Sequence, residues 1–239
     1  METKIDIDSF QEDLRPGYDF HLPSLTDASN SRGLVFKAIV SGSHVLDVGC
    51  DTGRFGEVLR KQKYCTVDGI EPCARAAQLA SSRLDKIFIQ PVENERSFEE
   101  FENYDAVLFL DVLEHLVDPW SVLEGAKKAL KPGGAIYVVV PNIAHISIVR
   151  RLVLGDFEYQ KYGTMDKTHL RWFTRKSLQR ALEDAGFINI KIDGLTSIPY
   201  LGKRSNALRF IENQLGRLFP NMFSGSILGH GQVYSSCQR

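Results

Sequence analysis

The segment 44–56 constrains the fold of this chain more than any other part of the sequence. A short apolar run ends in Asp47, and a turn that contains Gly49 and Gly53 follows. A helical pattern then begins at Arg54. A strand, a glycine-rich loop and a helix N-terminus in this order are typical of α/β proteins that hold a nucleotide-like ligand. The segment therefore predicts an open sheet with a ligand site at the end of an early strand.

The glycine spacing narrows the choice of ligand. Dinucleotide-binding loops carry G-x-G-x-x-G, so that the backbone can approach a pyrophosphate. Here the glycines fall at 49, 53 and 56, and Asp51 stands where the second glycine would be. A carboxylate at that position would repel a pyrophosphate and would suit a ligand with a positive centre. An NAD-binding dehydrogenase is therefore the less favoured interpretation.

Strand and helix patterns alternate along the middle of the chain, which predicts a mostly parallel sheet covered on both faces. Asp118 and Pro119 are suited to begin a helix, and the run 131–134 ends it. The predicted strands are 44–48, 65–70, 86–89, 104–110, 134–140, 187–193 and 231–236. The predicted helices are 53–62, 72–83, 118–130 and 174–185.

Four motifs occur in the order found in one large enzyme family. They are Asp47-x-Gly49-x-x-x-Gly53, the stretch 65–72 ending in Glu71-Pro72, the stretch 104–111 ending in Asp111, and Leu130-Lys-Pro-Gly-Gly134. Together they resemble class I S-adenosylmethionine-dependent methyltransferases over residues 40–193, although many members have glycine at the position of Asp51. The resemblance implies a Rossmann-like, doubly wound, seven-stranded sheet, mostly parallel with an antiparallel last strand. It also implies S-adenosylmethionine as cofactor and S-adenosylhomocysteine as product.

The resemblance assigns parts of the cofactor to individual residues. Gly49 and Gly53 let the backbone approach the amino-acid tail, and Asp47 reaches the ammonium of that tail or else caps the loop. Glu71 accepts hydrogen bonds from the ribose diol, or instead caps the helix after Pro72. The remaining predicted contacts are Val92 over the adenine ring, Glu93 at its amino group, Leu110 and Asp111 beneath the methionine portion, Cys50 and Asp51 in the loop, Pro72 beside Glu71, and Tyr18 over the cofactor or at the surface.

Two further segments offer catalytic groups, Asp111-x-x-Glu114-His115 and Thr168-His169. A hydroxyl nucleophile must lose its proton, which calls for a base or a metal ion near the sulfonium. His169 is the first candidate for the base and His115 the second. Both segments resemble ubiquinone-pathway O-methyltransferases and small-RNA 2′-O-methyltransferases, in which matching residues can gather a divalent cation. Here the ligands would be Asp111, Glu114, His115 and His169. A metal ion stays open as an alternative that is not favoured.

Three segments lie outside the alternating pattern of predicted strands and helices. Residues 1–40 are predicted to form an N-terminal cap before a methyltransferase domain at 41–239. Insertions at about 142–173 and 194–230 are predicted to complete a substrate lid, the second with an amphipathic helix carrying Leu208, Ile211, Leu215 and Leu218. Within the first insertion, Trp172 and Phe173 are expected to belong to the core.

The amino-acid composition limits the kinds of molecule that this protein is expected to bind. The net charge is −1 and the pI is about 6.6, so nothing favours nucleic acid. The polar start of the sequence is no signal peptide, no apolar run could span a bilayer, and the cysteines form no C-x-x-C pair. We therefore expect a cytoplasmic enzyme that methylates a small molecule, most plausibly a hydroxyl of a sugar, quinone or natural-product intermediate. The alternatives are a metal-dependent RNA 2′-O-methyltransferase and a non-catalytic domain that binds S-adenosylmethionine; the oligomeric state stays open.

Overall fold

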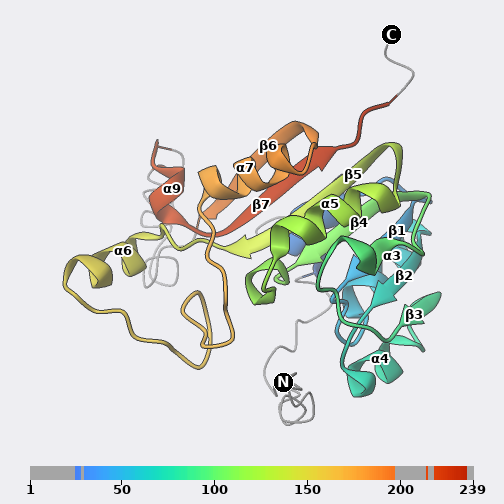
Figure 1. Cartoon of the computed structure of the whole chain (residues 1–239), viewed down its shortest axis with the longest axis horizontal. Helices are drawn as coiled ribbons and strands as arrows, with labels where there is room; N and C mark the ends of the chain where they lie inside the picture. Colours follow the sequence, from blue (N-terminus) through green and yellow to red (C-terminus); the bar gives the residue numbers. More distant parts are fainter. Residues whose placement is uncertain (1–24, 28–29, 197–213, 215–217, 236–239) are drawn as a thin grey trace, which may run out of the picture.

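The fold is a seven-stranded sheet with helices on both faces (Figure 1). The structure is a computed structural model, and it describes residues 25–27, 30–196, 214 and 218–235. The strand order is β3-β2-β1-β4-β5-β7-β6. Strands β1 to β5 are parallel to one another, whereas β7 runs antiparallel to both β5 and β6. The predicted fold class is confirmed, including the antiparallel last strand.

The sheet is built from apolar central strands, as a sheet covered on both faces requires. Every residue of β1 after the first is buried, and six of the seven residues of β4 are buried. The strands are β1 (His44–Val48), β2 (Thr66–Ile70), β3 (Lys86–Phe88), β4 (Tyr104–Leu110), β5 (Leu130–Pro141), β6 (Ile188–Thr196) and β7 (Ser224–Gln232).

Two hydrophobic cores lie on opposite faces of the sheet. One contains apolar side chains of α5 (Pro119–Ala129) and α7 (Arg175–Asp184). The other contains side chains of α2 (Ser31–Ala38), α3 (Arg54–Lys63) and α4 (Ala74–Ala80). Because both cores bury apolar side chains on β1 and β4, the carboxyl ends of these strands are held rigidly.

The predicted helix boundaries agree with local capping. The backbone N–H of Ser121 donates to Asp118 Oδ1 at 3.2 Å, and Pro119 is the first residue of α5. The Thr174 side chain caps α7 by accepting from the N–H of Ser177, and the Ser177 side chain accepts from the N–H of Thr174. A capping side chain satisfies backbone donors that the first helical turn leaves without partners.

The prediction of the last strand at 231–236 is wrong in position, because β7 ends at Gln232. Its sequence contains three glycines, which lower the expectation of a strand. Two of them lie against tightly packed side chains: a Cβ at Gly229 would lie 3.0 Å from Leu178 on α7, and one at Gly231 would lie 3.0 Å from Phe187. The chain between β6 and β7 therefore spans 197–223, shorter than the predicted insertion at 194–230.

The insertion after β5 contains a helix that the sequence analysis did not predict, α6 (Ile146–Val153). This helix and the chain that follows it extend away from the sheet (Figure 1). Short elements complete the described part: η2 (Glu95–Phe98), η3 (Leu113–His115) and α9 (Pro220–Phe223). Most of the predicted helix at 208–218, and most of the cap at 1–40, lie outside the described residues.

In the part of the chain that the structure describes, no helix has the length and apolar character needed to cross a membrane. Cys50, Cys65 and Cys73 are free thiols.

Candidate active site

The glycines of the loop after β1 have backbone conformations that favour glycine. Gly49 and Gly53 have φ values of 68° and 74°, and a Cβ at Gly49 would lie 2.7 Å from Val112 Cγ2. Asp51 also has a positive φ, 49°, which is unfavourable for a residue with a side chain. The N–H groups of Gly49 and Cys50 both donate to the carbonyl of Ile70, at 2.8 and 3.1 Å. The loop is thus folded tightly over the carboxyl ends of β1 and β2.

Glu71, the first residue after β2, joins this loop to the next one. Its Oε2 accepts from the N–H of Asp51 at 2.9 Å, and its Oε1 accepts from the N–H of Cys73 at 2.8 Å. Burial raises the pKa of Glu71, whereas these two hydrogen bonds lower it. Each carboxylate oxygen has a further lone pair. The side chain therefore stabilises the loops and can still accept from a ligand.

Asp47 is the acid at the end of β1, and it is 3% exposed. Burial raises its pKa to about 7, with Arg32 opposing and Glu71 and Asp51 adding to the rise. Three acids thus crowd one end of the sheet, which favours a ligand with a positive charge.

Arg32 is a site residue that the sequence analysis missed. It lies on α2, and its Nη1 forms an ion pair with Asp111 Oδ2 at 2.9 Å. Its charge also lowers the pKa of both Asp47 and Glu114. The only local signal in the sequence is Asn30, whose side chain caps α2 by accepting from the N–H of Gly33. Nothing in that segment indicates which strand end the helix approaches.

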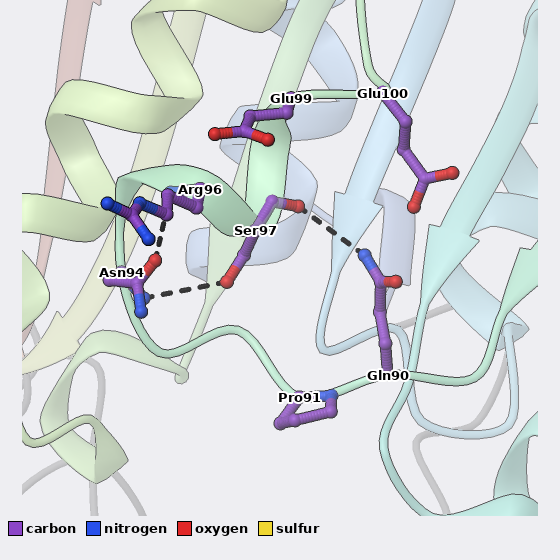
Figure 2. Close-up of a pocket in the computed structure, with 7 residues that line it drawn as sticks. All are labelled: Gln90, Pro91, Asn94, Arg96, Ser97, Glu99 and Glu100. Carbon is purple, nitrogen blue, oxygen red and sulfur yellow. Dashed lines mark hydrogen bonds between the residues drawn. The ribbon is translucent and has the colours of Figure 1, made fainter.

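The loop after β3 holds the residues predicted for adenine. Val92 is buried and belongs to the core, whereas Glu93 is exposed and its N–H donates to Ser97 Oγ at 3.2 Å. A cavity of about 470 Å³ lies beside this loop (Figure 2). None of the residues predicted to bind the cofactor lines it, so we do not assign it to the cofactor; its lining residues are Gln90, Pro91, Asn94, Arg96, Ser97, Glu99 and Glu100.

The structure brings the two predicted catalytic segments together. The carbonyl of Glu114 on η3 accepts from the N–H groups of Leu170 and Arg171, at 2.7 and 3.0 Å. The rings of His115 and His169 meet edge to face, with centroids 4.8 Å apart. Ligand atoms of Glu114, His115 and His169 all lie within 4.8 Å of one another. Residues more than fifty positions apart in the sequence therefore form one cluster beyond the carboxyl end of β4.

Backbone carbonyls determine the tautomer of both histidines. Nδ1 of His169 lies 3.0 Å from the carbonyl oxygen of Thr164, and Nδ1 of His115 lies 3.2 Å from that of Thr168. Because a carbonyl oxygen can only accept, Nδ1 carries the proton in each ring. Each neutral imidazole therefore has its lone pair on Nε2. This is the form required of a general base or of a metal ligand.

Glu114 is the buried member of the cluster, 2% exposed. Its Oε2 has no hydrogen-bond partner among the described residues. Burial, with Asp111 adding to it, raises the pKa of Glu114 well above its usual range, and Arg32 opposes the rise. A buried carboxyl oxygen without a partner is costly unless a proton, a cation or a ligand satisfies it. The donor set thus fits a divalent cation, although Asp111 is engaged with Arg32 instead.

The other predicted residues are placed as follows. Leu110 is buried at the end of β4, and Asp111 follows it with a φ of 63°. Pro72 is exposed. Phe173 is buried as expected, whereas Trp172 is only partly buried. Tyr18 lies outside the described residues.

Comparisons with known proteins identify the family. A family model described as a methyltransferase domain matches residues 26–192. The ubiquinone biosynthesis O-methyltransferase of Aliivibrio fischeri (strain MJ11) is 31% identical over 174 residues, which cover 68% of this chain and 73% of that protein. The enzyme of the same name from Klebsiella pneumoniae (strain 342) is 32% identical over 106 residues, 42% of this chain and 43% of that protein.

Solved structures share the fold at low sequence identity. A SAM-dependent methyltransferase from Archaeoglobus fulgidus has a TM-score of 0.59 at 18% identity, covering 90% of this chain and 100% of that one. Phosphoethanolamine N-methyltransferase 2 from Haemonchus contortus, solved with S-adenosyl-L-methionine, has a TM-score of 0.54 at 14% identity, covering 84% of this chain and 51% of that one.

The fold and these matches define a class I S-adenosylmethionine-dependent methyltransferase. The chain belongs to the methyltransferase domain family whose model spans residues 26–192. S-adenosylmethionine, the cofactor predicted from the sequence motifs, is the cofactor of this class, and the dehydrogenase alternative is set aside.

Proposed function

We propose that this enzyme transfers the methyl group of S-adenosylmethionine to a hydroxyl of a small-molecule acceptor, with His169 as the base. The observation that carries the proposal is the hydrogen bond between His169 Nδ1 and the carbonyl of Thr164, which leaves the lone pair on Nε2. The A. fischeri relative is named as an O-methyltransferase, in agreement with this choice.

The reaction needs one proton transfer and one displacement. As the hydroxyl oxygen attacks the methyl carbon, the oxygen–carbon bond forms and the carbon–sulfur bond breaks. The hydroxyl proton moves to Nε2 of His169, and S-adenosylhomocysteine leaves with the electron pair on sulfur. General-base catalysis of this kind typically contributes about 10²–10⁴-fold to a rate.

Residues around the glycine loop are suited to hold the cofactor. Glu71 has lone pairs for the ribose diol, and Asp47 is a buried acid whose charge would suit the ammonium of the tail. Arg32, paired with Asp111, lies close enough for its charge to lower the pKa of Asp47. We propose that it turns to the carboxylate of the methionine tail, since guanidinium and carboxylate form strong paired hydrogen bonds.

A divalent cation at the same cluster is the alternative to His169 as the base, because a metal bound at Nε2 of His169 would occupy the lone pair that accepts the proton. Glu114, His115 and His169 would hold it, and it would supply charge stabilisation to a hydroxyl that loses its proton. Titration with Mn²⁺, followed by its electron paramagnetic resonance signal, tests this directly. Binding that is lost in Glu114→Gln would support a metal site. Absence of binding would leave His169 as the base without a metal.

The cluster also favours the RNA 2′-O-methyltransferase alternative, because the same type of residues occurs in such enzymes. The near-neutral charge of the chain opposes it. Binding of short RNA that weakens steeply with salt would favour RNA, whereas no such binding would favour a small acceptor.

Calorimetric titration with S-adenosylmethionine and S-adenosylhomocysteine, on wild type and Glu71→Ala, tests the cofactor half of the proposal. An assay of S-adenosylhomocysteine release with hydroxyl and amine acceptors tests the other half. We expect micromolar binding that Glu71→Ala weakens, and turnover of hydroxyl acceptors only. Turnover of amines in place of hydroxyls would contradict O-methylation.

A further inference from the structure

Asp166 is a buried acid in a part of the chain that is otherwise mostly exposed. Every residue from 152 to 163 is exposed, and α6 before them contains no buried residue. Asp166 is nevertheless only 2% exposed, and it lies between Met165 and the turn that leads to His169, both of which are buried. Burying a carboxylate is costly unless hydrogen bonds satisfy it. The contacts of this acid therefore show what it holds in place.

The Asp166 side chain fixes the turn that follows it. Its Oδ1 accepts from both the backbone N–H and the hydroxyl of Thr168, at 2.9 and 2.8 Å. The backbone of Asp166 takes part as well. Its N–H donates to the carbonyl of Gly163, and its carbonyl accepts from the N–H of His169, both at 3.0 Å. Asp166 thus holds the chain on both sides of itself, from Gly163 to His169.

This turn supplies the two carbonyl groups that meet the histidine rings. Nδ1 of His169 lies 3.0 Å from the carbonyl oxygen of Thr164, and Nδ1 of His115 lies 3.2 Å from that of Thr168. Thr164 lies two residues before Asp166, and Thr168 lies two residues after it. Both carbonyl groups that determine the histidine tautomers therefore belong to the short segment that Asp166 holds together.

The peptide group between Thr168 and His169 shows this linkage most clearly. Its N–H donates to the carbonyl of Asp166, and its carbonyl oxygen faces Nδ1 of His115. A peptide group is planar, so a hydrogen bond that fixes its N–H also fixes the direction of its carbonyl. The Asp166 carboxylate holds the preceding N–H, that of Thr168 itself. Asp166 thus restrains Thr168 at both of its peptide bonds.

We propose that Asp166 is the positioning residue of the active site, which keeps the protons of His115 and His169 on Nδ1 by holding the turn from Thr164 to Thr168. A histidine whose Nδ1 loses its fixed acceptor can carry its proton on Nε2 instead. In that form Nε2 can neither accept a proton from a hydroxyl nor bind a cation. The inference rests on the proposed function, because it explains how the proposed base is kept in its active form.

Long-range ¹H–¹⁵N correlation spectra of protein labelled with ¹⁵N-histidine show the tautomers directly, because protonated and unprotonated ring nitrogens resonate apart. The chain has six histidines, so spectra of His115→Gln and His169→Gln assign the two signals of interest. At about pH 8.5, roughly two pH units above the usual histidine pKa, the rings are neutral. In the wild type we expect the proton of both rings on Nδ1. A proton on Nε2 of either ring would overturn the proposal.

Two substitutions of Asp166 separate its hydrogen bonds from its charge. Asp166→Ala removes the acceptor, so a large part of the molecules should carry the proton of His115 and His169 on Nε2. Asp166→Asn keeps an oxygen that can accept from Thr168, so it should retain the wild-type tautomers. Unchanged tautomers in Asp166→Ala would overturn the proposal.

The matched control is Asp85→Ala, at the other end of the sheet. Asp85 precedes β3, and its Oδ2 accepts from the N–H of Val67 at 2.8 Å. The variant therefore loses the same type of hydrogen bond between a carboxylate and a backbone N–H, far from the histidines. Both tautomers should stay as in the wild type. Changes as large as those in Asp166→Ala would show a general loss of stability and would overturn the proposal.

Turnover gives a second measurement. Loss of a residue that orients a functional histidine typically costs about 10–100-fold in activity, so Asp166→Ala should lower kcat by about tenfold or more. The affinity for S-adenosylmethionine, measured by calorimetry, should stay close to that of the wild type. Asp166→Asn should recover most of the wild-type kcat. An Asn variant as slow as the Ala variant would overturn the proposal, because the hydrogen bonds of Oδ1 would then not be the cause.

Thr168→Val provides the test if Asp166→Ala does not fold. It removes only the hydroxyl that donates to Asp166 Oδ1 and fills nearly the same volume. It should shift the same two tautomers in the same direction, to a smaller extent. No shift in a folded Thr168→Val variant would then overturn the proposal.

The two measurements separate the inference from the proposed function. If Asp166→Ala moves the protons to Nε2 but His169→Ala turns over as fast as the wild type, positioning by Asp166 stands and the base fails. If His169→Ala is slow while Asp166→Ala keeps both protons on Nδ1, only the inference fails.

Discussion

The two halves of the site are built in different ways. The cofactor half consists of short loops directly after β1 and β2, joined by hydrogen bonds to the buried carboxylate of Glu71. The acceptor half consists of η3 and the insertion after β5, joined by backbone hydrogen bonds to Glu114. The first half is compact and continuous with the sheet, whereas part of the second extends away from it (Figure 1).

This difference in construction indicates which part of the chain is suited to cofactor binding and which to acceptor binding. A cofactor shared by a large family is held by geometry that the strand ends impose, so its loop needs glycines and buried acids at fixed positions. The proposed acceptor half is an insertion, which can change without disturbing the sheet. Variants in one half should therefore leave the measured property of the other half intact.

The largest expected effect is on the rate. His169→Ala removes the base, so kcat should fall by about 10²–10³-fold, within the range for general-base catalysis. The affinity for S-adenosylmethionine, measured by calorimetry, should change less than about twofold. A loss of cofactor affinity as large as the loss of rate would mean that the two halves are not separate.

The second effect is on cofactor affinity. Glu71→Ala removes the predicted ribose contact and the acceptor of two backbone N–H groups. Hydrogen bonds to a charged group are worth about 1.5–3 kcal/mol, so the dissociation constant should rise about 10–100-fold. Glu93→Ala is the control for an exposed acid in the adenine loop and should have a smaller effect. Unchanged affinity in Glu71→Ala would place the cofactor elsewhere.

The third effect is on thermal stability. Gly49→Ala and Gly42→Ala are compared because the two glycines have similar backbone conformations. Gly49 and Gly42 have φ values of 68° and 79°, but a Cβ would lie 2.7 Å from Val112 Cγ2 at Gly49 and meets nothing within 4 Å at Gly42. Alanine at either position destabilises the fold by about 1–2 kcal/mol, because a residue with a Cβ is unfavourable in the left-handed conformation. Only Gly49→Ala adds overpacking against Val112, which costs about 1–3 kcal/mol more.

Thermal unfolding measures that comparison. About 1 kcal/mol corresponds to roughly 2–4 °C in a chain of this size, so Gly49→Ala should lower Tm by several degrees more than Gly42→Ala. Equal shifts would show that Val112 moves aside without cost and that the loop is less tightly packed than its contacts indicate.

The smallest effect is the pH dependence of cofactor binding. The pKa of Asp47 is raised to about 7, so this acid is mostly protonated and neutral below that pH. Binding of the cofactor ammonium favours the ionised form, and an α-amino group keeps its charge up to about pH 8. The affinity should therefore rise severalfold between about pH 5.5 and 7. Asp47→Asn should lose this dependence; if it persists in the variant, another group is responsible.

The loops of the proposed cofactor half could be predicted from the sequence because their signals are local. Gly49, Gly53 and Glu71 lie within one strand–loop–helix unit and the strand that follows it, where spacing alone fixes their places. The alternation of helices and strands predicted the sheet for the same reason. Among the strands, only β7 was misplaced. Its glycines pack closely against the side chains of Leu178 and Phe187, which are distant in the sequence, so no local pattern indicates the strand.

The acceptor half could be predicted only in part. The motifs that contain Glu114, His115 and His169 were visible, but their meeting depends on hydrogen bonds across more than fifty residues. Arg32 was missed because its position depends on how α2 packs on the sheet. Trp172 was expected in the core but is only partly buried.

The structure of the protein bound to S-adenosylhomocysteine tests the central claim most directly. We predict both ribose hydroxyls at Glu71, the amino-acid tail at the Gly49–Gly53 loop, and the sulfur facing the cluster of Glu114, His115 and His169. We also predict that Arg32 leaves Asp111 for the carboxylate of the tail. A ribose away from Glu71, or a sulfur that faces away from His169, would contradict the account.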